Sequence, residues 1–175
     1  MNTNNALEIR FNHTSRFLSS FVNRSERILD LGIENDLSKY LVADGYNITN
    51  TRGEDLDLEN RPGEKYGSFD VVTAFEILEH LVSPFELLRK LPADKLIVTV
   101  PLRLWFAPAY RSKRDPRDQH FHEFEEWQFD WLLNKAGWEI RAREKWVSPS
   151  RKPGIRPMLR RITPRYYAVY AERNS

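Results

Sequence analysis

Short apolar runs alternate with helix-like segments along most of this sequence, and this alternation constrains the fold more than any other feature. The strongest run is FDVVTAF at residues 69–75, whose β-branched and aromatic content is typical of a strand buried on both faces. Further strands are predicted at residues 27–32, 46–51, 95–101, 138–147 and 166–173, with a short one at 56–58. Strands that alternate with helices favour a parallel sheet covered by helices on both faces.

Helical periodicity fills the segments between these runs. Residues 37–45 place apolar side chains at i, i+3 and i+4 and end in a glycine that can adopt a left-handed conformation. Ser83 followed by Pro84 predicts the start of another helix, because proline is favoured at the first helical position. Two more helices are expected, within residues 1–23 and 124–136.

The end of the chain predicts a change of strand direction. Residues 148–165, between the last two strands, are rich in proline and leave no room for a crossover helix. A hairpin-like connection is more natural there, so one of the two strands should run antiparallel to its neighbours. The expected fold is therefore an α/β, doubly wound, Rossmann-like sheet, mostly parallel with an antiparallel C-terminal strand. Its 175 residues fit a single domain, 1–175, made of an N-terminal helix in 1–23 and an α/β core in 24–175.

The distribution of charge and the composition indicate which partners and which location to expect for this chain. Residues 141–165 hold nine basic side chains and one acid, so this stretch could face nucleic acid or another anionic partner. A solvated loop is the favoured interpretation. The chain has no cysteine, no signal-peptide pattern and no apolar run near the ~20 residues that span a bilayer. We therefore expect a cytoplasmic location without a membrane partner.

The order of motifs resembles one known family. The run ILDLG, the acidic DLDLE, the stretch SFDVVTAFEILEHL and the strand LIVTVP follow one another as in class I S-adenosylmethionine-dependent methyltransferases, especially their small-molecule branch. The resemblance spans about residues 24–173, and FDVVTAFEILEHL is its most specific part. It implies a seven-stranded sheet, S-adenosylmethionine as cofactor, and methyl transfer to a small-molecule substrate.

The family's glycine-rich loop, D-x-G-x-G, is altered here. The resemblance implies cofactor contacts for Asp30, Gly32 and Ile33 in this loop, and for Phe75 at the end of the 69–75 strand. Glu34 replaces the second glycine, which normally lets the backbone approach the ligand. A glutamate there adds bulk and negative charge beside a ligand carboxylate. Weaker cofactor binding follows unless Glu34 turns outward or pairs with the ligand's ammonium group.

A second departure lies at the end of the 46–51 strand. The family commonly places an acid there, which accepts hydrogen bonds from the ribose hydroxyls. This chain has Asn50 instead, whose neutral amide can still accept such a bond, but the contact is weaker without a charge. Glu54 and Asp55 are the nearest acids. Asp55 or Asp57 matches the family aspartate that contacts the adenine amino group. The resemblance therefore implies Asn50 and Asp55 as further cofactor contacts.

Two candidate catalytic residues follow the 69–75 strand. Glu76 comes directly after an apolar strand, where the family's cleft opens, and His80 follows four residues later, on the same face of a helix. A histidine near neutral pKa can act as a general base for a substrate hydroxyl or amine. The alternative for His80 is a structural hydrogen bond to the backbone.

The segment 102–123 is where the family builds its substrate cover, and Arg103, His120 and His122 are its candidate substrate contacts. His120, His122 and Glu123 are residue types that bind zinc, but three ligands so close in sequence rarely converge without a fourth from elsewhere, so no metal is expected.

Two functions from different classes remain open. The first is S-adenosylmethionine-dependent methyl transfer, in which the protein supplies binding and orientation. The second is a non-catalytic methyltransferase-like binding or scaffold module with a weakened cofactor site. Glu34 and Asn50 favour the second, whereas the FDVVTAFEILEHL stretch favours the first.

Overall fold

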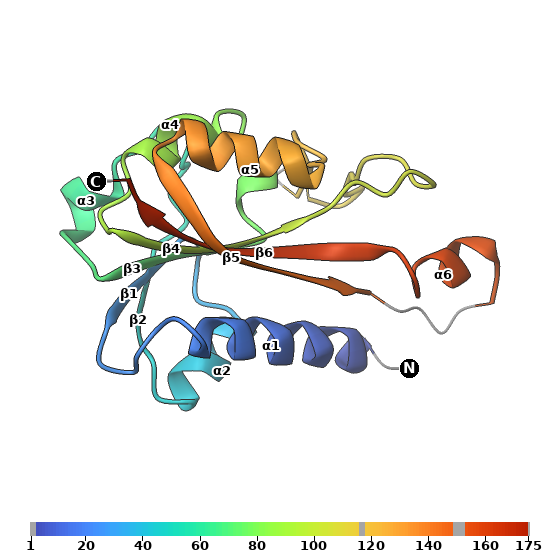
Figure 1. The fold of residues 1–175 in the computed structure, drawn as a ribbon, viewed down its shortest axis with the longest axis horizontal. Helices are drawn as coiled ribbons and strands as arrows, with labels where there is room; N and C mark the ends of the chain where they lie inside the picture. The colour runs from blue at the N-terminus through green and yellow to red at the C-terminus, as the bar shows by residue number, and fades with distance from the viewer. Residues whose placement is uncertain (1–2, 116–117, 149–152, 175) are drawn as a thin grey trace.

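The computed structural model describes residues 3–115, 118–148 and 153–174. Its centre is a sheet in the order β2-β1-β3-β4-β6-β5 (Figure 1). The β1–β2, β1–β3 and β3–β4 pairs are parallel, whereas β6 pairs antiparallel with both β4 and β5. This confirms the predicted antiparallel C-terminal strand. The strands are β1 (Arg27–Asp30), β2 (Asn47–Asn50), β3 (Val71–Phe75), β4 (Lys95–Pro101), β5 (Trp138–Val147) and β6 (Pro164–Arg173).

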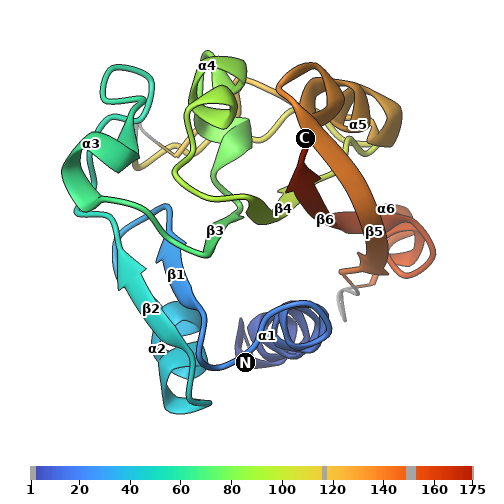
Figure 2. The same ribbon diagram turned by 60° about the vertical axis from the view of Figure 1, so that its left-hand side comes forward.

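Helices cover both faces of this sheet, as Figures 1 and 2 show. The helices α1 and α2 pack on one face through a cluster that includes Leu18 and Ile97. On the opposite face lie α4 and α5, over a cluster that includes Leu88 and Phe129. The helices are α1 (Thr3–Ser19), α2 (Asp36–Ala43), α3 (Pro62–Tyr66), the 3₁₀ turn η1 (Leu78–His80), α4 (Pro84–Arg89), α5 (Glu126–Lys135) and α6 (Ile155–Leu159).

The prediction of a short strand at residues 56–58 is wrong. The described residues form six strands, whereas the resemblance implies seven. The segment folds into a turn, because the backbone N–H groups of Leu58 and Glu59 donate to the carbonyl of Asp55. Asp57 then accepts from the backbone N–H groups of Val82 and Ser83, just before α4. These local bonds take the place of a strand ladder.

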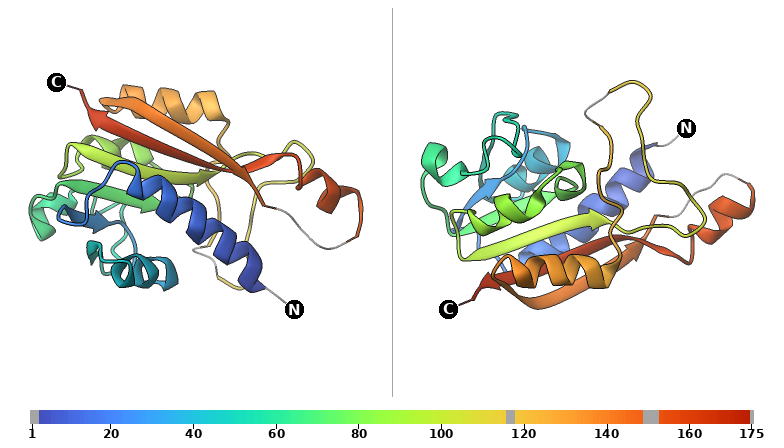
Figure 3. Two further views of the ribbon diagram at one scale, coloured as in Figure 1. Left: turned by 60° about the horizontal axis from the view of Figure 1, so that its bottom comes forward. Right: turned by 90° about the horizontal axis from the view of Figure 1, so that it is seen from above.

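The two segments with candidate binding roles extend from the sheet. Between β4 and α5 the described residues form irregular backbone, and Figure 3 shows this loop and α6 reaching away from the layers. In the basic segment 141–165, residues 149–152 lie outside the described part. On β5, Arg141 pairs with Glu139 and Glu172, and Arg143 with Asp130. Among the described residues, no helix has both the length and the apolarity needed to cross a membrane.

Candidate functional site

The loop after β1 is held tightly against its neighbours at the carboxyl edge of the sheet. The backbone N–H of Leu31 donates to the carbonyl of Thr73, and that of Gly32 donates to Thr51 Oγ1 at 2.7 Å. Gly32 has a φ of +141°, and a Cβ atom there would lie 3.3 Å from Ile77 Cδ1. Both the backbone conformation and the space therefore favour glycine at this position.

Asp30 ends β1 and ties three strands together. Its Oδ1 accepts from Thr73 Oγ1 at 2.6 Å, and its Oδ2 accepts from Asn50 Nδ2 at 2.9 Å. The Asn50 amide also reaches the carbonyl of Gly32 at 3.3 Å. Burial raises the pKa of Asp30 to about 6, although both hydrogen bonds act to lower it. The predicted cofactor contacts Asp30 and Asn50 thus form a network that supports the loop.

A cleft of about 340 Å³ opens beside this network, and we call it the α1 cleft. Asp30 and Leu31 form part of it after β1, and residues 35–37 contribute the start of α2. Residues 75–77 and Thr99 form the wall that follows β3 and β4. The remaining lining comes from α1, through Leu7, Arg10, Phe11 and Thr14. None of the described residues of 102–123 lines this cleft; the N-terminal helix covers it instead.

Two oppositely charged groups in the α1 cleft have buried atoms without hydrogen-bond partners. These atoms are Arg10 Nε and Glu76 Oε1. The positive charge of Arg10 acts to lower the pKa of Glu76, but burial outweighs it and raises that pKa. Sequence analysis missed Arg10, because its role depends on α1 folding back over the sheet edge. The only signal was its place beside Phe11 in the helix predicted within residues 1–23.

Glu76 itself has an unusual backbone. Its φ is +58°, the left-handed region that non-glycine residues seldom occupy, and its N–H donates to the carbonyl of Thr99. The helical turn begins only at Leu78, so the expectation that Glu76 and His80 share one helix face is wrong. The left-handed residue turns the chain away from the strand direction and places the Glu76 side chain in the cleft. Such strained positions concentrate at functional sites.

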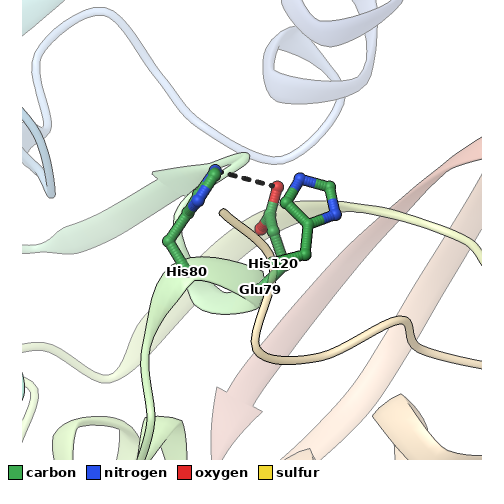
Figure 4. Close-up of side chains that lie close together, drawn as sticks. All are labelled: Glu79, His80 and His120. Carbon is green, nitrogen blue, oxygen red and sulfur yellow. Dashed lines mark ion pairs between the residues drawn. The ribbon is translucent and has the colours of Figure 1, made fainter. Parts of the chain in front are cut away.

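Beside the cleft, η1 and the 102–123 loop bring Glu79, His80 and His120 together, with the two imidazole rings on either side of the carboxylate (Figure 4). Their nearest ligand atoms all lie within 4.8 Å of one another. Burial and the Glu76 carboxyl raise the pKa of Glu79 well above its usual range, and burial lowers the pKa of His80. Sequence analysis named both histidines but missed Glu79, although it stands in the FDVVTAFEILEHL motif.

Glu34 and Ile33, which follow Gly32, point away from the α1 cleft. The Glu34 side chain is 66% exposed, and its Oε1 lies 3.4 Å from Lys39 Nζ. Its φ is not positive, so the backbone does not need glycine there. Of the two alternatives for Glu34, the outward orientation is the one observed. Ile33 is exposed and lies over Gly53, where a Cβ atom would be 3.0 Å from Ile33 Cγ2.

The acids after β2 are mostly engaged in local contacts. Glu54 is buried and accepts from the backbone N–H of Arg52, from Lys65 Nζ and from the Tyr66 hydroxyl. Burial acts to raise the pKa of Glu54, but the bonds from Lys65 and Tyr66 lower it to about 2. Glu54, Lys65 and Tyr66 line part of a separate hollow of about 550 Å³. Asp55 is exposed and lines neither hollow, so its predicted adenine contact stays a prediction.

The remaining predicted contacts lie apart from the α1 cleft. Arg103 is exposed and pairs with Glu125 at 3.1 Å. His122 stacks on Phe124 and reaches the carbonyl of Val82 at 3.3 Å. Of the three candidate substrate residues, the structure therefore brings only His120 close to His80, at a ring-centroid distance of 4.9 Å.

Comparison with known proteins agrees with the fold. A family model described as a methyltransferase domain matches residues 7–143. An S-adenosylmethionine-dependent methyltransferase structure from Listeria monocytogenes is 13% identical, covers 94% of this chain and 100% of its own, and has a TM-score of 0.62. One from Methanosarcina mazei is 14% identical, with coverages of 90% and 97% and a TM-score of 0.61. No curated protein matches the chain.

A further similar structure is the N-terminal domain of EvdMO1 in the presence of S-adenosylhomocysteine and D-fucose. It is 14% identical, covers 94% of this chain and 82% of its own, and has a TM-score of 0.57. The chain belongs to the class I S-adenosylmethionine-dependent methyltransferases. S-adenosylmethionine is the cofactor of this class.

Proposed function

We propose that this protein transfers a methyl group from S-adenosylmethionine to a small-molecule acceptor. The observation that carries the proposal is the pair of opposite charges in the α1 cleft, Arg10 and Glu76, each of which has a buried atom without a hydrogen bond. The methionine part of the cofactor has a carboxylate and an ammonium group, so the two residues match its charges. When bound, the cofactor supplies an electrophilic methyl group on its sulfonium, and the protein supplies binding and orientation.

Each residue in or beside the cleft then has a distinct role. Arg10 binds the carboxylate through its guanidinium, and Glu76 accepts from the ammonium group. Gly32 keeps the loop free of a side chain, and Phe75 offers an apolar wall. Asn50 already donates to Asp30, which leaves its Oδ1 as an acceptor for one ribose hydroxyl. Asp30 positions Asn50 and the loop through its hydrogen bonds.

The acceptor would approach from the side of Glu79, His80 and His120. His80 Nδ1 lies 2.9 Å from the carbonyl of Gln119, and a carbonyl can only accept, so Nδ1 carries the hydrogen. His80 Nε2 is therefore the nitrogen able to take a proton as a general base. That role stays a prediction, because transfer to a good nucleophile depends mainly on proximity and alignment.

One observation favours the alternative, a binding or scaffold module with a weakened cofactor site. The carboxyl end of β2 offers the neutral Asn50 for the ribose, and the nearby Glu54 is engaged by Lys65 and Tyr66. The Glu34 argument for this alternative no longer holds, because Glu34 faces outward. The two functions therefore differ in how tightly the adenosine end is held and whether transfer follows.

Thermal unfolding with S-adenosylhomocysteine tests the cofactor claim. A ligand that binds only the folded state raises the melting temperature with dose, by an amount set by its affinity. We expect a dose-dependent rise with S-adenosylhomocysteine and a smaller one with adenosine, which lacks the groups that Arg10 and Glu76 bind. No rise at millimolar S-adenosylhomocysteine would rule out the proposed function.

Methyl transfer itself is tested with S-adenosylmethionine labelled on its methyl group. Incubation with a pool of small metabolites should move the label into a new product of low molecular mass. Binding without any such product would favour the scaffold module, and label in a macromolecule would contradict the small-molecule acceptor.

A further inference from the structure

The cluster formed by Glu79, His80 and His120 comes from two segments far apart in the sequence. Glu79 and His80 lie on η1, and His120 lies in the loop before α5. Backbone bonds join the segments, because the N–H groups of Phe121 and His122 both donate to the carbonyl of Glu79. The convergence of the side chains is therefore fixed by main-chain contacts.

Both imidazoles are held through one ring nitrogen and leave the other free. His80 Nδ1 donates to the carbonyl of Gln119, and His120 Nδ1 lies 2.9 Å from Glu123 Oε1. In each ring Nε2 then carries the lone pair. Metal-binding histidines are oriented in this way, with the second ring nitrogen bonded to a carbonyl or a carboxylate.

One oxygen of the Glu79 carboxylate lacks a hydrogen-bond partner in this setting. Its side chain is 1% exposed, and its Oε2 is buried without a hydrogen bond. Its Oε1 lies 3.8 Å from His80 Nε2, which is too far for a hydrogen bond. A buried carboxylate oxygen without a donor is costly, and the unpartnered Oε1 of nearby Glu76 adds to that cost. A cation among these groups would remove it.

We propose that Glu79, His80 and His120 bind a divalent transition-metal ion, with Zn²⁺ as the best match. Imidazole nitrogens favour zinc and its neighbours in the first transition row over Mg²⁺ and Ca²⁺, which prefer oxygen ligands. Ligand atoms around a tetrahedral zinc lie about 3.4 Å apart, since zinc–nitrogen and zinc–oxygen distances are about 2.1 Å. Small side-chain rotations from the present separation, within 4.8 Å, bring them to that distance.

Three protein ligands leave a coordination position for water or an oxygen atom of a second molecule. A metal on His80 Nε2 uses the lone pair that a general base would need, so it excludes that role for His80. Binding of the ion requires neither cofactor nor acceptor. Its test is therefore independent of the proposed methyl transfer.

The test measures metal bound by the tag-free full chain after stripping with a chelator. We expect about one equivalent of Zn²⁺ after dialysis, and with Co²⁺ a visible absorption band from a site with nitrogen and oxygen ligands. His120→Ala and Glu79→Gln should each weaken binding at least 100-fold. Glu123→Gln should weaken it about tenfold, because that carboxylate only orients His120.

His122→Ala is the matched control, because His122 is two residues away in the same loop and bonds the carbonyl of Val82. It should bind Zn²⁺ as the wild type does. Should the site variants fail to fold, the wild type loaded with Cu²⁺ gives a second readout, an electron spin echo signal from two coordinated imidazoles. The proposal is overturned by a wild type that retains no metal, by equal losses in His120→Ala and His122→Ala, or by fewer than two imidazoles.

Discussion

Two groups of polar side chains meet at the carboxyl edge of this sheet, and they differ in whether their hydrogen bonds are satisfied. Asp30 bonds to both Thr73 and Asn50. Arg10, Glu76 and Glu79 form the second group, and each has a buried atom without a hydrogen-bond partner. Buried polar atoms are nearly always paired, so these unpaired atoms mark groups that can bind a ligand. The comparison separates residues that build the site from residues that would hold its ligands.

Substituting Asp30, the residue at the centre of the fully hydrogen-bonded group, should have the largest effect on stability. Asp30→Ala leaves the Thr73 hydroxyl without its acceptor and leaves the Asn50 amide only the longer bond to the carbonyl of Gly32. We expect the free energy of unfolding to fall by about 3 to 4 kcal/mol, since each unsatisfied buried group costs about 1 to 3 kcal/mol. Denaturant-induced unfolding measures the change.

The matched control is Asp36→Ala, which also lines the α1 cleft but is exposed at the start of α2. It should cost about 0.5 kcal/mol, the size of a favourable interaction with the helix dipole. Equal losses in the two variants would contradict a supporting role for Asp30.

The pH dependence of unfolding sharpens the same contrast. Burial raises the pKa of Asp30 from 3.8 to about 6, so the folded state binds this proton more tightly than the unfolded chain does. The stabilisation from Asp30 is complete below about pH 4 and is lost as the pH rises through about 6. It amounts to about 2 to 3 kcal/mol.

Asp30→Asn, which cannot titrate, provides the reference. Between pH 7 and pH 4 the free energy of unfolding of the wild type should rise relative to this variant by about 2 to 3 kcal/mol. Parallel pH profiles would show that the pKa of Asp30 is not raised.

The smallest effect is expected at Glu34, outside both groups. Its carboxylate is exposed and pairs only with Lys39, and such surface pairs contribute about 0 to 1 kcal/mol. Glu34→Gly should therefore change the affinity for S-adenosylhomocysteine less than about twofold, as measured by isothermal titration calorimetry. A tenfold gain would mean that Glu34 crowds the ligand after all.

The fold was largely predictable because its signals are local. The run FDVVTAF is β3, Ser83-Pro84 opens α4, and the proline-rich segment before β6 predicted its change of direction. The strand at 56–58 failed because hydrogen bonds to Asp55 and Asp57 hold that segment as a turn. The bonds to Asp57 come from Val82 and Ser83, just before α4, and local strand propensity cannot predict such distant contacts.

The site was less predictable because its geometry is made by distant segments. Asp30 and Gly32 follow a recognisable pattern, but Arg10 enters only because α1 folds over the cleft. The Glu79 and His120 side chains are about forty residues apart in the sequence and meet through the loop between β4 and α5, whose path no local pattern specifies. The outward turn of Glu34 was one of two alternatives that sequence alone left open.

The central claim is that the opposite charges of Arg10 and Glu76 in the α1 cleft hold the cofactor, and one titration tests it most directly. Calorimetry of S-adenosylhomocysteine into the wild type and Arg10→Gln should show one site, weakened about tenfold to a hundredfold in the variant, as expected for a lost charged hydrogen bond. Arg16→Gln, on the same helix but paired with Glu144, should bind as the wild type does. Equal affinities for wild type and Arg10→Gln, or no binding to either, would contradict the account.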